Sequence, residues 1–247
     1  MAEVSSLTDE LLTLDRGNTT LDCMLHTATG LARQRMGPDD ADALREFLSG
    51  PVVRAIGLSV VDQGLSMAQL VLEELGIPLS VAGIDVPCPL DVGYSDPSTL
   101  GVDRWVGAVA AWREWGDAII VDCGTAVTVN LVTREGGFVG GAIGPGPRTM
   151  AHGLGDCAGA LPAVDLDAEP AVPTSSSLDA VNAGVSIGFC GLVERLVDDL
   201  IEATSSQQAA LLITGGDAPT YLRHGRTPFQ HVPDLVHRGL RCLDEPE

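Results

Sequence analysis

Two turns of this chain have nearly the same sequence and occupy comparable places in its two halves. They are Asp15-Arg16-Gly17-Asn18-Thr19 and Asp122-Cys123-Gly124-Thr125. Each lies between two apolar segments of strand length, so each is predicted to connect two strands. In such a turn Gly lets backbone N–H groups approach a phosphate, Thr adds a hydroxyl donor and Asp holds a cation. Either turn alone is typical of an ordinary hairpin, and their recurrence in both halves favours a phosphate-binding pair.

The segments around these turns repeat one order. The first half is predicted to contain strands at 12–17 and 21–27, a helix at 38–49, a strand at 52–61 and helices at 67–76 and 102–115. The second half is predicted to contain three strand segments within 118–143, a helix opened by Pro145-Gly146-Pro147, a helix at 178–204, a strand at 209–216 and a C-terminal helix. This order predicts an α/β fold with mixed sheets flanked by helices and a ligand cleft between the halves. The predicted domains are 1–115, 116–232 and a C-terminal helix, 233–247, that packs back on the first half.

The charged residues limit the possible mechanisms and partners. All 14 basic residues are Arg, which excludes the lysine-dependent chemistry of P-loop enzymes, protein kinases and Schiff-base enzymes. The 34 acidic residues bring the net charge to −20, and no basic stripe interrupts them, so no nucleic-acid partner is expected. No uninterrupted apolar run reaches the roughly 18 residues of a membrane span, and the first residues do not have the pattern of a signal or transit peptide. We therefore expect a cytoplasmic protein without a membrane partner.

An acid and an arginine stand together at the predicted start of the helix at 102–115. Asp103 and Arg104 follow the loop Tyr94-Ser95-Asp96-Pro97-Ser98-Thr99-Leu100-Gly101. An isolated Asp in a first helical turn is commonly a surface acid that the helix dipole favours. Beside an Arg, which binds a carboxylate or phosphate bidentately, the Asp is also a candidate acceptor of a hydroxyl proton in phosphoryl transfer.

Two glycine-rich segments follow predicted strands. Gly140-Gly141-Ala142-Ile143-Gly144-Pro145-Gly146 precedes a helix, and Thr214-Gly215-Gly216 ends a strand. Such segments bring backbone close to a ligand, and they are equally typical of close packing between elements.

In their order and in their approximate spacing, these motifs resemble those of the type III pantothenate kinases. The resemblance spans nearly the whole chain and includes PDLVHRGL at 233–240 as well as the motifs above. This family belongs to the superfamily of acetate and sugar kinases, Hsp70 and actin. The resemblance therefore implies two tandem ribonuclease-H-like, or actin-like ATPase, domains. It also implies a homodimer that phosphorylates pantothenate with ATP in the first step of coenzyme A synthesis, using Mg²⁺ and a monovalent cation, K⁺ or NH₄⁺.

The resemblance also implies a role for each motif residue. Asp103 would be the general base, and the pantothenate-binding residues would be Tyr94, Gly101, Arg104 and Ser177. The residues that bind the phosphates of ATP would be Asp15, Gly17, Asn18, Thr19, Gly124 and Thr125. Asp15 would hold Mg²⁺, and Asp122 would lie at the monovalent cation.

Three positions depart from the family pattern. Asp22 stands where many members have a basic residue, which predicts added negative charge near the triphosphate. Ser177 replaces a Thr that reaches pantothenate across the dimer, and Arg16 replaces a small or apolar residue. These departures leave two alternatives open. One is a kinase of the same superfamily with another small hydroxyl substrate, and the other is a catalytically impaired nucleotide-binding regulator.

Overall fold

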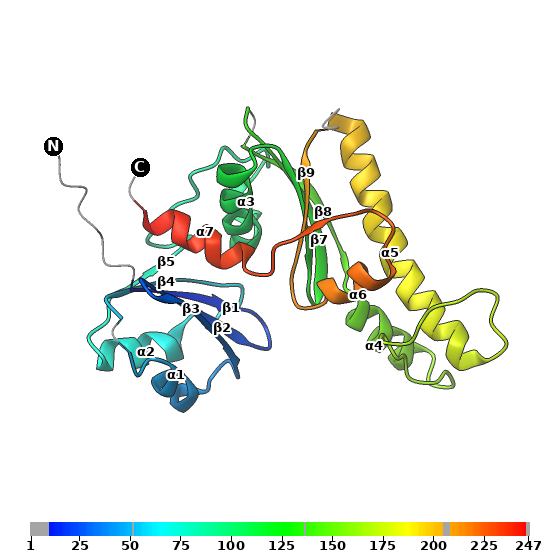
Figure 1. Ribbon diagram of the computed structural model, residues 1–247, viewed down its shortest axis with the longest axis horizontal. Helices are drawn as coiled ribbons and strands as arrows, with labels where there is room; N and C mark the ends of the chain where they lie inside the picture. The colour runs from blue at the N-terminus through cyan, green and yellow to red at the C-terminus, as the bar shows by residue number, and fades with distance from the viewer. Residues whose placement is uncertain (1–9, 51, 136, 205–207, 246–247) are drawn as a thin grey trace. The chain divides into compact units, whose positions relative to one another are not determined.

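A computed structural model describes residues 10–50, 52–135, 137–204 and 208–245 (Figure 1). These residues form two compact units. Unit 1 contains the described residues within 10–90, 98–110 and 235–245, and unit 2 contains those within 91–97 and 111–234. Each unit is built on one five-stranded sheet.

The sheet of unit 1 has the order β3-β2-β1-β4-β5. Its strands are β1 Leu11–Arg16, β2 Leu21–Thr27, β3 Gly30–Met36, β4 Arg54–Ser59 and β5 Leu79–Val81. The first three strands are antiparallel neighbours, whereas β4 lies parallel to both β1 and β5. The sheet is therefore mixed, as predicted.

Helices cover both faces of this sheet. Alternate residues of β1, Leu12 and Leu14, belong to a buried core with residues of α1 Ala41–Phe47 and α2 Ser66–Glu74. On the opposite face, α7 Leu235–Asp244 packs on β1 and β4, and Thr13 Oγ1 lies 2.8 Å from His237 Nδ1. Because side chains alternate between the faces of a strand, Asp15 points to the same side as Thr13, and Arg16 to the side of Leu14.

The sheet of unit 2 repeats this arrangement with the order β10-β9-β6-β7-β8. Its strands are β6 Ala118–Cys123, β7 Ala126–Thr133, β8 Gly137–Pro145, β9 Ala210–Thr214 and β10 Gln230–His231. Strands β6, β7 and β8 are antiparallel neighbours, and β9 lies parallel to β6 and β10. Two similar mixed sheets in one chain agree with the predicted α/β class.

Unit 2 also contains a long apolar helix. Its helices are α4 Pro147–Cys157, α5 Ser177–Thr204 and α6 Ala218–His224, and α3 Val102–Glu114 runs from unit 1 into unit 2 after a short 3-10 helix, Pro97–Thr99. Residues 177–203 of α5 are long and apolar enough to cross a membrane. The buried face of α5 contains Phe189, Val193 and Val197, which pack in the core against β6 and β7, as expected for the core helix of a globular unit.

The sequence-based assignment is confirmed for most helices and strands and incomplete for four. The helices predicted at 38–49, 67–76, 102–115 and 178–204 are present, with ends shifted by up to three residues. The prediction omitted β3, β5, α6 and β10. Six of the seven residues of β3 are exposed at the edge of the sheet, so this strand lacks the apolar alternation that indicates a half-buried strand.

Candidate functional site

The first phosphate turn connects β1 to β2. The backbone N–H of Gly17 donates to the carbonyl of Thr20 at 3.0 Å and closes the turn. Asn18 and Thr19 are exposed at its tip, and no described backbone hydrogen bond engages their N–H groups. Two exposed N–H groups and a hydroxyl at one strand end form a suitable cradle for phosphate oxygens.

The charge beside this turn differs from what the sequence predicts. Asp22 faces Asp15 across the β1–β2 pair, and its carboxylate accepts hydrogen bonds from Arg33 at 2.9 and 2.7 Å and from Arg35 at 2.6 Å. His237 Nε2 lies 3.4 Å from Asp22 Oδ1. Burial alone raises the pKa of Asp22, but the hydrogen bonds from His237, Arg33 and Arg35 lower this pKa well below its usual range.

The negative charge predicted at Asp22 is therefore present, but it is paired with two arginines. Its side chain is 8% exposed, and both arginines that compensate it come from β3, the strand that the sequence pattern did not indicate. The two guanidinium groups offset the charge of this carboxylate, while Asp15 on the neighbouring strand carries a second carboxylate. The arginines thus supply cationic charge beside the turn, where the family pattern has a basic residue.

The second phosphate turn connects β6 to β7 in unit 2 and is shorter, because two residues lie between its strands and four lie between β1 and β2. The N–H of Gly124 donates to the carbonyl of Ala126 at 3.0 Å, and Thr125 is exposed. The carbonyl of Thr125 accepts from the N–H of Gly146 at 3.0 Å and from Thr149 Oγ1 at 2.6 Å. A Cβ at Gly146 would overlap the carbonyl of Gly124, so the glycine-rich segment packs directly against the turn.

The Thr214-Gly215-Gly216 segment supports the same turn. Gly215 has a φ of +92°, and a Cβ there would overlap the carboxylate of Asp122 and the carbonyl of Cys123. The backbone N–H of Asp217 donates to that same Cys123 carbonyl at 2.8 Å. The sequence left this motif open between ligand binding and packing, and the structure shows that it packs against Asp122.

The acid and arginine at 103–104 lie at the start of α3 in unit 1. Asp103 Oδ1 accepts a hydrogen bond from the N–H of Arg104 at 2.9 Å. Burial raises the pKa of Asp103, although this hydrogen bond and the charge of Arg104 act in the opposite direction. A Cβ at Gly101 would lie 2.7 Å from Asp103 Oδ1, so the glycine leaves room for the carboxylate. The Arg104 side chain is itself buried at the base of the helix.

Tyr94 lies in unit 2, on a segment that runs beside β8. Gly93 N donates to the carbonyl of Phe138, and Phe138 N donates to the carbonyl of Asp91, both at 2.8 Å. The Tyr94 and Phe138 rings meet edge to face with centroids 5.9 Å apart. These contacts fix the half-buried Tyr94 against the strand.

Ser177 is the first residue of α5 and is exposed. The preceding residue, Ser176, caps the helix: its Oγ donates to Asp179 Oδ2 at 2.6 Å and accepts from the N–H of Asp179 at 3.1 Å. The Ser177 hydroxyl is therefore not needed for the cap and lies at the surface.

The predicted site residues thus fall into two groups. Unit 1 contains Asp15, Gly17, Asn18, Thr19, Gly101, Asp103 and Arg104, whereas unit 2 contains Tyr94, Asp122, Gly124, Thr125 and Ser177. Within unit 1, Gly101, Asp103 and Arg104 are brought into direct contact. Within unit 2, Asp122, Gly124 and Thr125 share one turn, which is supported by Gly146 and Gly215.

Both turns lie within a segment of the chain that matches a known protein family. The model of a family described as type III pantothenate kinase matches residues 11–199. This chain belongs to the type III pantothenate kinase family. A type III pantothenate kinase of Nocardia farcinica is 32% identical over 93% of this chain and 95% of its own length. Another from Syntrophotalea carbinolica is 31% identical over 94% of this chain and 97% of its own length. The resemblance carried by the sequence motifs is therefore confirmed, and the chain is a kinase.

Solved structures confirm the actin-like fold of this kinase. A putative Baf family transcriptional activator from Campylobacter jejuni superposes with a TM-score of 0.57 at 19% identity, covering 94% of this chain and 96% of its own. MreB5 of Spiroplasma citri superposes with a TM-score of 0.52 at 10% identity, covering 95% of each chain. At such low identity, these similarities show only the architecture of this pantothenate kinase family member. Its chemistry is argued from its own site residues.

The carboxylates of this kinase suit metal-assisted nucleotide binding. Mg²⁺ is usually held by one or two carboxylates together with phosphate oxygens, so it does not need a cage of protein ligands. Asp15 and Asp122 each place one carboxylate beside a phosphate turn, and the space that a side chain at Gly215 would fill is left to Asp122. The described residues contain no group of three or more His, Cys, Asp or Glu side chains that could hold a metal.

Proposed function

We propose that this kinase transfers the γ-phosphoryl group of ATP to the terminal hydroxyl of pantothenate, giving 4'-phosphopantothenate in the first step of coenzyme A biosynthesis. The observation that carries this proposal is the Asp103–Arg104 pair at the start of α3 in a chain of this family. The pair provides a carboxylate with a raised pKa next to a buried guanidinium. A base and an anion-binding group are thus joined in one helical turn.

Asp103 is the general base of the proposed reaction. Its carboxylate accepts the proton of the pantothenate hydroxyl as the oxygen attacks the γ-phosphorus and ADP leaves. Because burial raises the pKa of Asp103, its carboxylate is a stronger proton acceptor than an ordinary aspartate. Arg104 binds the pantothenate carboxylate, and Tyr94, Gly101 and Ser177 complete the substrate contacts.

Each of the two phosphate turns contributes contacts to the nucleotide. Asp15, Gly17, Asn18 and Thr19 bind phosphates from unit 1, and Gly124 and Thr125 bind them from unit 2. A divalent cation is required for kinase chemistry of this type, and we assign Mg²⁺ to Asp15 and a monovalent cation, K⁺ or NH₄⁺, to Asp122. The cations neutralise phosphate charge, which a chain of net charge −20 cannot do by itself.

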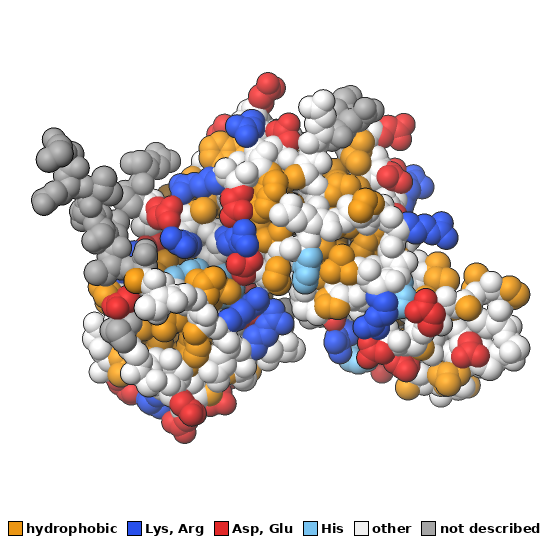
Figure 2. All heavy atoms as spheres, viewed as in Figure 1, with side chains coloured by type: hydrophobic (Ala, Val, Ile, Leu, Met, Phe, Trp, Pro, Cys, Tyr) orange, Lys and Arg blue, Asp and Glu red, His pale blue; other side chains and the backbone are white. Residues whose placement is uncertain are grey.

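The partners follow from the same assignment. We propose that the protein is a cytoplasmic homodimer in which Ser177 contacts pantothenate in the partner's site. Each chain has proposed domains at 1–115 and 116–232 and a terminal segment at 233–247. Nucleic acid is not a partner, because the chain is strongly acidic and its arginines lie in small groups among acidic side chains on the face shown in Figure 2. No membrane partner is proposed.

The test is a coupled assay of ADP release with ATP, Mg²⁺ and K⁺, run with and without pantothenate. We expect ADP release that depends on pantothenate. Release that instead requires another small alcohol would assign a different substrate within the superfamily. ATP binding without release, across a panel of alcohols, would identify a nucleotide-binding regulator and contradict the proposal.

Replacing Arg104 with Lys is expected to raise the KM for pantothenate about tenfold or more, with a smaller effect on the KM for ATP. Lys keeps the positive charge but cannot form two parallel hydrogen bonds with a carboxylate. Initial-rate kinetics with each substrate varied in turn measure both constants. An unchanged pantothenate KM would show that Arg104 does not bind the carboxylate.

A further inference from the structure

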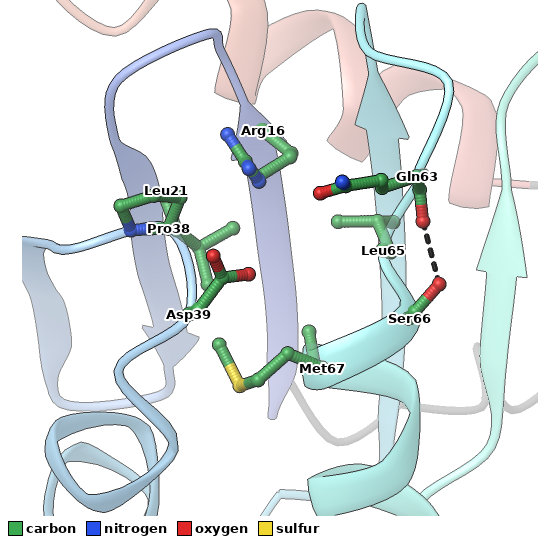
Figure 3. A pocket seen from close by; sticks show the side chains of 10 residues that line it. Arg16, Leu21, Pro38, Asp39, Gln63, Leu65, Ser66 and Met67 are labelled. Carbon is green, nitrogen blue, oxygen red and sulfur yellow. Dashed lines mark hydrogen bonds between the residues drawn. The ribbon is translucent and has the colours of Figure 1, made fainter.

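Unit 1 contains a cavity on the side of its sheet opposite Asp15. The cavity has a volume of about 220 Å³ and lies between the end of β1 and the first turn of α2 (Figure 3). It is lined by Arg16, Leu21, Pro38, Asp39, Gln63, Gly64, Leu65, Ser66, Met67 and Ala68. None of these residues is assigned a ligand contact in the site proposed above, although Arg16 belongs to the first phosphate turn.

Arg16 places a buried positive charge in this cavity. The side chain is only 6% exposed, and no carboxylate of the described residues forms an ion pair with it. Its Nη1 donates to the neighbouring carbonyl of Gly17, and the side chain lines the cavity. A buried guanidinium without a counter-ion is costly, and an anionic ligand would relieve that cost.

The start of α2 adds a second, independent preference for negative charge. The helix has nine residues, and Leu65 at its N-cap contributes no side-chain hydrogen bond. The residues of its first turn, Ser66, Met67 and Ala68, line the cavity. The N–H groups of a first helical turn have no partners within the helix and carry a partial positive charge. Arg16 and this helix terminus therefore face the same space.

The remaining lining defines the kind of anion. In Figure 3 the side chains of Gln63 and Asp39 point toward the space beside Arg16. Asp39 is exposed, and its negative charge disfavours a dianion more strongly than a monoanion. Leu21, Leu65 and Met67 supply an apolar wall, which suits a hydrocarbon chain. A planar carboxylate also matches the two-pronged geometry of a guanidinium.

We propose that this cavity binds a small monocarboxylate with a short hydrocarbon chain, its carboxylate on Arg16 and the start of α2 and its chain against the apolar wall. This binding does not depend on the proposed kinase function, because none of its contacts involves the nucleotide or pantothenate site. Arg16 stands between Asp15 and Gly17, so the ligand would also contact the residue that connects the cavity to the first phosphate turn.

The test is calorimetric titration of the full chain, without nucleotide, with butyrate and 3-methylbutanoate at constant ionic strength. We expect dissociation constants near the millimolar range, as is usual for so small a ligand. Butyramide, the neutral analogue of butyrate, should bind at least tenfold more weakly, because it lacks the charge that pairs with Arg16.

Three variants locate the binding. Arg16→Leu should weaken butyrate binding tenfold or more, whereas Asp39→Asn should tighten it severalfold by removing the opposing charge. Arg195→Leu is the matched control, because Arg195 is exposed and pairs with Asp199 on α5 in the other unit. This control also removes one guanidinium, and it should bind butyrate like the unchanged chain.

Several results would overturn the proposal. They are no heat of binding at millimolar butyrate, equal weakening by Arg195→Leu, or butyramide binding as tightly as butyrate. If inorganic phosphate binds in a way that depends on Arg16 and butyrate does not bind, the ligand of the cavity is a phosphate and not a carboxylate. If Arg16→Leu does not fold, the Asp39→Asn variant and the amide analogue decide the question. ADP release serves as the separate test of the kinase function, so the two proposals can fail independently.

Discussion

Replacing Asp103 with Asn is expected to lower turnover by about 10²–10⁴-fold, while ATP binding stays close to that of the unchanged chain. Asn has the size and shape of Asp, and its carbonyl oxygen can still accept the 2.9 Å hydrogen bond from the N–H of Arg104. The start of α3 should therefore be preserved. The amide cannot take up the proton of the attacking hydroxyl, so the substitution slows the chemical step.

The pH profile gives this prediction a second readout. A general base acts in its ionised form, so kcat/KM should fall as the pH is lowered through the pKa of Asp103 in the free enzyme. An ordinary aspartate has a pKa of about 3.9. Because burial raises the pKa of Asp103, the fall in kcat/KM should occur at a higher pH than an ordinary aspartate would give. The acidic limb that belongs to Asp103 should be absent from the residual activity of Asp103→Asn.

Asp42→Asn is the matched control for this experiment. Asp42 also lies in the first turn of a helix, α1, but its side chain is 98% exposed and forms a surface pair with Arg45. It should retain full turnover and the normal pH profile. Turnover of Asp103→Asn similar to that of the control would show that Asp103 is not the base.

The sequence predicted the elements whose signals are local. The helix predicted at 102–115 is α3, Val102–Glu114, and the one predicted at 178–204 is α5, Ser177–Thr204, because apolar residues at helical spacing mark a face that must be buried. Both phosphate turns were equally evident, since Asp, Gly and Thr specify a turn through their own backbone and side-chain chemistry. These features need no information from distant parts of the chain.

The electrostatic environment of the first turn could not be predicted in this way. Asp22 was expected to add negative charge near the triphosphate, and the sequence did not indicate that Arg33, Arg35 and His237 surround it. The two arginines come from an exposed edge strand without an apolar pattern, and the histidine comes from the last helix. Such contacts depend on how strands and helices pack, and a single sequence holds no local signal for them.

Replacing Asp22 with Asn is expected to lower the free energy of unfolding at pH 7 by about 2 kcal/mol. Hydrogen bonds to charged groups contribute roughly 1.5–3 kcal/mol each. We discount their sum because Arg33 and Arg35 are 27% and 50% exposed, so water screens their charges. Urea unfolding of both proteins at pH 7 measures the difference. Asp42→Asn, an exposed acid with one surface pair, should change it by less than about 0.5 kcal/mol.

The stabilisation from Asp22 should disappear in acid. Its pKa in the folded chain lies below its value of about 3.9 in the unfolded chain, so the unfolded state takes up a proton first as the pH falls. The contribution is therefore fully present above about pH 5 and decreases as the pH falls through about 4 toward the folded pKa. Each pH unit in that interval removes up to about 1.4 kcal/mol.

Comparing the unchanged chain with Asp22→Asn isolates this effect from the other acids, because those acids titrate in both proteins. The two unfolding free energies should differ by a constant amount between pH 7 and pH 5 and converge between about pH 4 and pH 3. Curves that stay parallel down to pH 3 would show that the Asp22 pKa is not lowered by folding. In that case the arginines of β3 would not be held by Asp22, and their positive charge would be free to act beside the first phosphate turn.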